Sequence, residues 1–275
     1  TVLDVSKFKT GKAENMAGMF QYCISLSNID VEGFDTNNVK NMSGLFQDTT
    51  GVSRLDVANF KTGNVDRINN MFQDCNELTS IDVSKFDTSK VTDISQMFSR
   101  CSSLKEIDVS EFKTSNVITI GNMFADCVNL TSIDVSHFDV RKVTSLGGLF
   151  RNCSKLTKID VTNFKTESLT MIGNMFEYCS SLSSIDISGF DMSKVFSASS
   201  LFNGCKSLRR LDLRNFDGNL LRDTNYLFKD CESLTSLDLS NFGAKSITSM
   251  YGMFKGCKNL ETVKNIFGND SCTRG

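Results

Sequence analysis

The sequence contains no proline and a single histidine among its 275 residues. Without proline it has no proline-rich linker, and no linker-like segment indicates a second globular domain. No apolar run approaches the ~18 residues that a membrane-spanning helix needs, so we expect no direct membrane insertion. The formal net charge of −2 gives no electrostatic reason to expect nucleic acid or an anionic membrane as a partner.

What the sequence has instead is one unit of 26 residues, repeated without insertion or deletion. A fixed period of this length indicates a solenoid, in which each turn contacts only its neighbours and all turns share one core. We predict one repeat domain of about ten repeats over residues 1–263, with a degenerate repeat or tail over 264–275. The clearest marker of the period is an aspartate, found at Asp4, Asp30, Asp56, Asp82, Asp108, Asp134, Asp160, Asp186, Asp212 and Asp238. Because the chain opens inside a repeat, we expect a fragment of a longer protein, and the missing signal peptide says little about its compartment.

Each unit predicts a strand followed by a return leg. Leu78-x-x-Ile81-x-Val83 alternates as a strand does and has the spacing of a leucine-rich-repeat strand. Later apolar residues lie three and four positions apart, which suits a short helix, although small residues between them also allow a tight irregular path; they are Val91, Ile94, Met97, Phe98 and Cys101. The predicted fold is an α/β repeat solenoid, leucine-rich-repeat-like. It has one short parallel β-strand per 26-residue turn and a short helical or irregular return leg.

Nine of the ten cysteines occupy one column of the repeat, with Thr49 in the one missing place; they are Cys23, Cys75, Cys101, Cys127, Cys153, Cys179, Cys205, Cys231 and Cys257. Stacked strands lie ~4.8 Å apart, which brings neighbouring thiols within reach of one another. Parallel side chains in one column nevertheless have poor geometry for a disulfide. We expect a buried, reduced ladder whose thiols act as small apolar groups, with occasional disulfides between adjacent turns as the alternative.

The aspartate column invites a functional interpretation as well as a structural one. Its carboxylates point away from the core on the strand face, with Ser or Thr two residues later. We favour hydrogen bonds that fix the turn at the end of the strand. A weak calcium site is the alternative, because Ca²⁺ prefers several oxygen ligands, with Asp82, Asp108, Asp134 and Asp160 as candidates. No other metal site is expected.

The sequence shows no residue pattern typical of an enzyme active site. His137 falls at a variable position of the repeat and is expected to be a solvated side chain. No Cys-x-x-Cys pair and no glycine-rich phosphate loop occurs. The carboxylates form a uniform ladder, whereas acid–base catalysis needs two groups in different environments. We therefore expect no enzyme, no catalytic residue and no cofactor.

Specificity in a repeat protein is expected where one unit departs from the others. Arg210 and Arg214 replace the usual small residues on both sides of Asp212, and Arg209 lies beside them. Arginine is enriched at binding hot spots, so these four residues are candidate partner-binding residues. A solvated charge cluster is the alternative interpretation.

A second departure falls on the return leg. Phe196, Tyr226 and Tyr251 occupy columns that are otherwise small or polar. They are further candidates for partner binding as an exposed aromatic patch. Alternatively, they fill space left by Ala198 and Thr224, which replace apolar core residues.

The unit Met-Phe-x-x-Cys-x-x-Leu-x-x-Ile-Asp-Val-Ser-x-Phe-Asp-Thr-Ser-x-Val-Thr, seen from Met71 to Thr92, closely resembles the 26-residue repeat of bacterial surface proteins. That family is related to the BspA-like leucine-rich repeats, whose Ala-Phe-x-x-Cys-x-x-Leu-x-x-Ile core is similar. The resemblance covers residues 1–263 and implies an extracellular, cell-surface protein, often lipid- or wall-anchored and used in adhesion. It supplies no catalytic residue, and no anchor motif lies in this sequence.

The favoured function is a non-enzymatic cell-surface repeat module that binds a protein or glycan on a host or neighbouring cell. The alternative is a rigid structural spacer, or stalk, of a larger surface protein with no ligand of its own. Ice or mineral binding is a weaker idea, which needs an exposed threonine ladder such as Thr10, Thr36, Thr62, Thr88 and Thr114.

Overall fold

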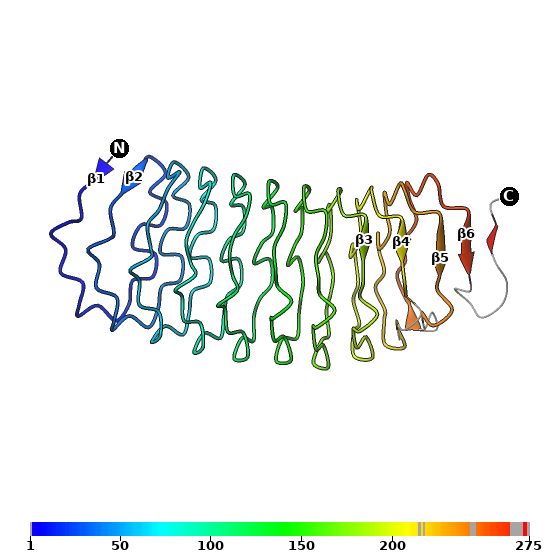
Figure 1. The fold of residues 1–275 in the computed structure, drawn as a ribbon. Helices are drawn as coiled ribbons and strands as arrows, with labels where there is room; N and C mark the ends of the chain where they lie inside the picture. Colours follow the sequence, from blue (N-terminus) through cyan, green and yellow to red (C-terminus); the bar gives the residue numbers. More distant parts are fainter. Residues whose placement is uncertain (1, 214–215, 217, 243–245, 265–271, 274–275) are drawn as a thin grey trace.

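The computed structural model shows the chain as a row of stacked coils, with the two termini at opposite ends of the row (Figure 1). The structure describes residues 2–213, 216, 218–242, 246–264 and 272–273. No α-helix is assigned within these ranges. Most of the predicted tail, 264–275, lies outside them, and the boundary at residue 263 stays a prediction.

The strands are only two or three residues long and pair with the turns before and after them (Figure 1). They are β1 (Val2–Leu3), β2 (Asn28–Ile29), β3 (Ser184–Ile185), β4 (Arg210–Leu211), β5 (Ser236–Asp238), β6 (Thr262–Lys264) and β7 (Cys272–Thr273). β1 pairs with β2, β3 with β4, and β5 with β6, each in parallel and with partners 26 positions apart. β7 pairs antiparallel with β6. The predicted short parallel strands are therefore present in some turns only. Between β2 and β3 the strand position has one bridge, Arg54 with Ser80, and the other isolated bridges, such as Asp93 with Thr119, lie on the return leg.

The return leg is not helical. Of the two predicted forms, helical or irregular, the structure shows the irregular one. Every second amide donates to a carbonyl of the next turn, as Ile94, Gln96 and Phe98 do at 2.9–3.0 Å. Two residues in each turn have a left-handed backbone, for example Gln96 (φ 57°) and Arg100 (φ 60°). A right-handed helix cannot continue through such residues. The spacing of three and four therefore reflects consecutive reverse turns rather than a helix.

The core is a spine of stacked phenylalanine rings. Phe124 lies 5.8 Å, centroid to centroid, from both Phe98 and Phe150, and its ring is nearly parallel to both. A second column, which includes Phe86 and Phe164, is also buried. Because burying each ring contributes ~1.5–3 kcal/mol, these two columns dominate the apolar stabilisation of the stack.

A column of threonines joins successive turns from the inside. The Thr88 hydroxyl donates to the carbonyl of Lys113 at 3.1 Å and accepts from the amide of the same residue at 2.7 Å. Thr10 and Thr36 make the same pair of bonds one turn on. These side chains are buried, so the idea of an exposed threonine ladder that binds ice or mineral is wrong.

Replacing Thr88 by valine should lower the free energy of unfolding by about 1–3 kcal/mol, because it removes two partly buried hydrogen bonds and leaves the amide and carbonyl of Lys113 without the Thr88 hydroxyl. Urea denaturation followed by circular dichroism measures the change. Thr119→Val, an exposed position on the return leg, is the control and should have little effect. The reverse change, Val140→Thr in the buried column, should raise stability. Equal losses in Thr88→Val and Thr119→Val would contradict this account.

Candidate functional site

The predicted cationic spot lines an open groove on the strand face, which we call the strand-face groove. It measures about 750 Å³ and is lined by Arg209, Arg210, Leu211, Asp212, Leu213, Ser233, Thr235, Ser236 and Asp238. The parallel pairing of β4 with β3 fixes the backbone at Arg210, opposite Ser184. Three of the four predicted residues are therefore brought together, while Arg214 lies outside the described residues.

The strand-face groove combines two guanidinium groups and the Asp212 carboxylate with the hydroxyls and the Asp238 carboxylate of the next turn. Arg209, Arg210 and Asp212 are exposed. A guanidinium presents a rigid fork of donors that matches a carboxylate. The groove can therefore hold a partner that offers carboxylates beside neutral polar groups.

The aromatic candidates are only partly brought together. The rings of Tyr226 and Tyr251 meet edge to face at 5.2 Å, and the Lys229 ammonium lies 5.4 Å from the centre of the Tyr226 ring. Phe196 makes no ring contact with either tyrosine among the contacts of the described residues. Phe196 and Tyr251 are exposed, so they do not fill core space beside Ala198 or Thr224.

The aspartate column caps the turns that follow the strands. Asp134 accepts hydrogen bonds from the amide and the hydroxyl of Ser136, at 2.9 and 2.7 Å. These bonds hold the pKa of Asp134 below its ordinary value. The same bonds form at Asp82 and Asp160, and Asp108 accepts the amide of Ser110.

The weak calcium candidates are not assembled into a coordination sphere. Asp82, Asp108 and Asp134 line one groove of the strand face, and Asp160 lines the next. Within the described ranges, no three His, Cys, Asp or Glu side chains lie close enough together to hold a metal ion. The observed bonds of these carboxylates are those of turn caps.

His137 lies on the surface of the stack. Its Nε2 lies 2.9 Å from the carbonyl oxygen of Val109 in the preceding turn, and its ring meets Phe138 edge to face. The side chain thus joins two turns of the solenoid.

The cysteine ladder is a ladder of hydrogen-bond donors. The Cys127 thiol donates to the carbonyl of Phe98 in the preceding turn at 3.1 Å, and burial raises its pKa to about 12. The cysteines of the ladder are free thiols, as the favoured prediction held. The bond recurs, always to a phenylalanine 29 residues earlier, at Cys75, Cys101, Cys153, Cys179, Cys205, Cys231 and Cys257.

Thr49 stands in the cysteine column but makes a different bond. Its hydroxyl donates at 2.7 Å to the carbonyl of Phe46, three residues earlier in its own turn, whereas the thiols donate to the preceding turn. The prediction that the thiols act only as small apolar groups did not include their hydrogen bonds.

A second groove, on the return leg, was not foreseen. This return-leg groove measures about 610 Å³ and takes one residue from each of five successive turns, namely Asp74, Arg100, Asp126, Asn152 and Tyr178. Asn76, Ser102, Val128, Arg151 and Glu177 complete its lining.

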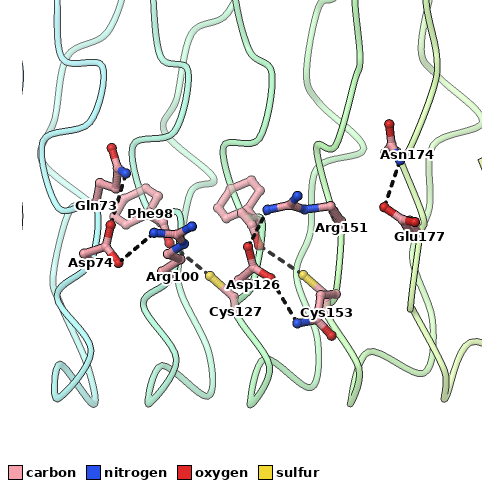
Figure 2. Close-up of polar contacts among 12 residues, drawn as sticks. Gln73, Asp74, Phe98, Arg100, Asp126, Cys127, Arg151, Cys153, Asn174 and Glu177 are labelled. Atoms are coloured by element: carbon pink, nitrogen blue, oxygen red, sulfur yellow. Dashed lines mark hydrogen bonds and ion pairs between the residues drawn. The ribbon is translucent and has the colours of Figure 1, made fainter. Parts of the chain in front are cut away.

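Polar contacts run along the return-leg groove from turn to turn (Figure 2). Arg151 donates to Asp126 at 2.6 Å, and Asn152 donates to the same carboxylate at 3.0 Å. Arg100 lies 3.5 Å from Asp74 (Figure 2). Sequence analysis missed these pairs because their columns vary in residue type and show no motif.

Comparison with known proteins agrees with the repeat. A family described as "Mycoplasma protein of unknown function, DUF285" matches residues 1–82, 68–184 and 172–269. No match was found among curated proteins. Nor does the described part of the chain contain a helix with the length and apolarity to cross a membrane.

Similar solved structures include bacterial leucine-rich-repeat proteins. A leucine-rich repeat protein of T. pallidum is 23% identical, with 54% of this chain and 63% of that chain covered and a TM-score of 0.37. A leucine-rich-repeat protein of Eubacterium ventriosum and a leucine rich cell surface protein of Faecalibacterium prausnitzii are each 18% identical. Each match covers 90% of this chain and 75% of the other, with TM-scores of 0.48 and 0.45. This chain thus spans less than two thirds of the T. pallidum chain.

The predicted resemblance to the 26-residue repeats of bacterial surface proteins is confirmed by the family match. The three matched ranges overlap and together run from residue 1 to residue 269. The chain therefore belongs to the DUF285 repeat family.

Proposed function

We propose that the chain is a non-enzymatic binding module of a bacterial cell-surface protein, and that the strand-face groove contacts its partner, a protein or a glycan. One observation carries this proposal. Where neighbouring turns place Ser and Thr, β4 places Arg210 with Arg209 beside it. Both arginines line one groove with the hydroxyls and the one carboxylate, Asp238, of the following turn.

The chemistry of this groove favours a partner with carboxylates. Two adjacent guanidiniums match such groups with paired donors, and Arg is among the residues that dominate binding energy when an interface covers it. An acidic segment of a host protein or an acidic glycan has this character. Adhesion of the cell that displays the module would follow from such contacts.

Arg209→Thr combined with Arg210→Ser tests the site, because both changes restore residues that neighbouring turns carry at the same positions. Binding of the purified protein to a panel of host matrix proteins, glycans and cells should weaken by about tenfold or more. Arg54→Ser is the matched control, because Arg54 is an exposed arginine at the place of Arg210 in another turn. It should leave binding unchanged.

A double variant that binds as well as the wild type would move the contact site away from the strand-face groove. Wild-type protein that binds nothing on the panel would favour the spacer instead. The uniform stacking of the central turns supports that alternative, since rings 5.8 Å apart repeat without interruption from Phe98 to Phe150.

A further inference from the structure

We propose that the return-leg groove is a second binding site, one that takes a neutral, extended oligosaccharide. This proposal names a ligand class for a surface other than the strand-face groove. It rests on the proposed function only in one respect, namely that the module binds a ligand without catalysing a reaction. The two grooves have no lining residue in common. Each proposal can therefore fail without the other.

The length and spacing of the groove suit a linear chain of sugars. Five successive turns contribute the column that runs from Asp74 to Tyr178. The phenylalanine rings of these turns, which report the rise of the stack, are 5.5–6.0 Å apart. This rise is comparable with the length of one pyranose unit in an extended oligosaccharide. One sugar can thus lie over each turn.

The charges of the groove are already paired within the protein, which favours a neutral ligand. Arg151 is bonded to Asp126, and Arg100 lies beside Asp74 (Figure 2). The two carboxylate oxygens of Glu177 accept from amide groups, one from Asn203 and one from Asn174, both at 2.8 Å. A charged ligand would have to compete with these bonds. Sugar hydroxyls both donate and accept, so they add to such pairs without breaking them.

Two buried polar atoms at this groove have no hydrogen-bond partner. They are Nε of Arg151, which lines the groove, and Oδ1 of Asn203, whose side chain is bonded to the lining residue Glu177. Asn203 is only 4% exposed. Native structures satisfy nearly all buried polar groups, so such atoms call for an explanation. Nε of Arg151 is closed to solvent in this structure, so a sugar hydroxyl reaches it only after the Arg151 side chain moves.

The column of Arg100 and Tyr178 also carries side chains at a position whose left-handed backbone favours glycine. Arg100 and Tyr178 have φ values of 60° and 58°, while Gly204 and Gly256 occupy the same position in later turns. A side chain in this left-handed conformation costs energy that glycine does not. Such strain concentrates at functional sites. The same conformation recurs outside the groove, at Tyr22, Asp48 and Asp230, so it belongs to the turn of each repeat and does not by itself mark the site.

Tyr178 provides the platform that sugar binding needs. Its ring lies against Gly204, where an added Cβ would come within 2.4 Å of the ring. The side chain is nevertheless 44% exposed. The rigid ring can therefore stack on the C–H face of a sugar at the end of the groove, while Arg100, Asp126 and Asn152 meet hydroxyl groups.

Isothermal titration of the whole chain with neutral, linear β-linked hexose and N-acetylhexosamine oligosaccharides tests this proposal. Tyr178→Gly should weaken binding by about tenfold. The variant should fold, because Gly204 occupies the same place in a later turn. Tyr178→Phe keeps the ring and should bind as the wild type does. Tyr22→Gly is the matched control, since Tyr22 has the same column, a φ of 60° and an exposed ring, but lies outside the groove.

The Arg209→Thr, Arg210→Ser variant should bind these oligosaccharides with unchanged affinity, which separates this proposal from that for the strand-face groove. No binding by the wild type would overturn the inference. So would an equal loss in Tyr22→Gly, because the groove would then not be the site. Stronger binding of acidic polysaccharides or of peptides that displace the neutral sugars would overturn the ligand class.

Discussion

Replacing Phe124 by alanine should lower the free energy of unfolding by about 3–5 kcal/mol. Phe124 is fully buried and stacks on Phe98 and Phe150 at 5.8 Å on either side. The cavity cannot collapse easily, because the turn is held on both sides. The Phe124 amide donates to Leu149, and the Phe124 carbonyl accepts from the thiol of Cys153.

Urea denaturation followed by far-ultraviolet circular dichroism measures this loss. Phe196→Ala is the matched control: the same side chain is removed from an exposed position, and the expected change is small. Because stacked repeats are stabilised by their neighbours, Phe124→Ala should also broaden the transition by uncoupling the two halves of the stack. Equal losses in the two variants would show that the ring spine is not the main source of stability.

Stability should also fall steeply as the pH rises above about 9, because of the cysteine ladder. The ordinary pKa of a thiol is 9.0, and burial raises those of Cys75, Cys127 and Cys179 to about 12. Between these values the unfolded chain loses thiol protons that the folded chain retains. The stabilising contribution is therefore complete below pH 9 and is lost as the pH rises toward 12. Each buried thiol contributes about 1.4 kcal/mol per pH unit in this window.

The urea midpoint, followed from about pH 8 to pH 11, measures this slope. Cys127→Thr is the informative variant, because Thr49 shows that threonine fits the column, where its hydroxyl donates to a phenylalanine carbonyl of its own turn. It should reduce the slope by about 1.4 kcal/mol per pH unit and leave the titration of lysines and tyrosines unchanged. An unaltered slope would mean that the thiols do not control alkaline unfolding.

Much of the fold was predictable because the columns of the repeat are regular. The period of 26 residues and the buried rings follow from residue type and spacing alone. The strand predicted at Leu78-x-x-Ile81-x-Val83 is reduced in the structure to a single bridge at Ser80. The return leg was harder to predict, because its apolar spacing suits both a helix and a pair of reverse turns. The left-handed backbone at Gln96 and Arg100 decides in favour of the reverse turns. Neither glutamine nor arginine is a residue type that predicts this conformation.

The candidate sites divide in the same way. Arg209, Arg210 and Asp212 were found because they depart from their own columns and follow one another closely along the chain. The return-leg groove was not found, because its members, such as Asp126 and Tyr178, come from turns that are far apart in sequence. Only stacking brings them into one surface.

The sequence by itself determined that the chain is a solenoid, and which residues form its core. A fixed period places like residues above one another, and apolar columns can be buried only by stacking. The tertiary structure alone decided what the threonine and cysteine columns do. Their partners lie one turn away, 25 residues on for Thr88 and 29 residues back for Cys127, so no local pattern reveals the bond. The stacking of the turns therefore lets each such threonine hydrogen-bond to the next turn and each such cysteine donate to the preceding one. It also brings five residues that are far apart in sequence into one groove.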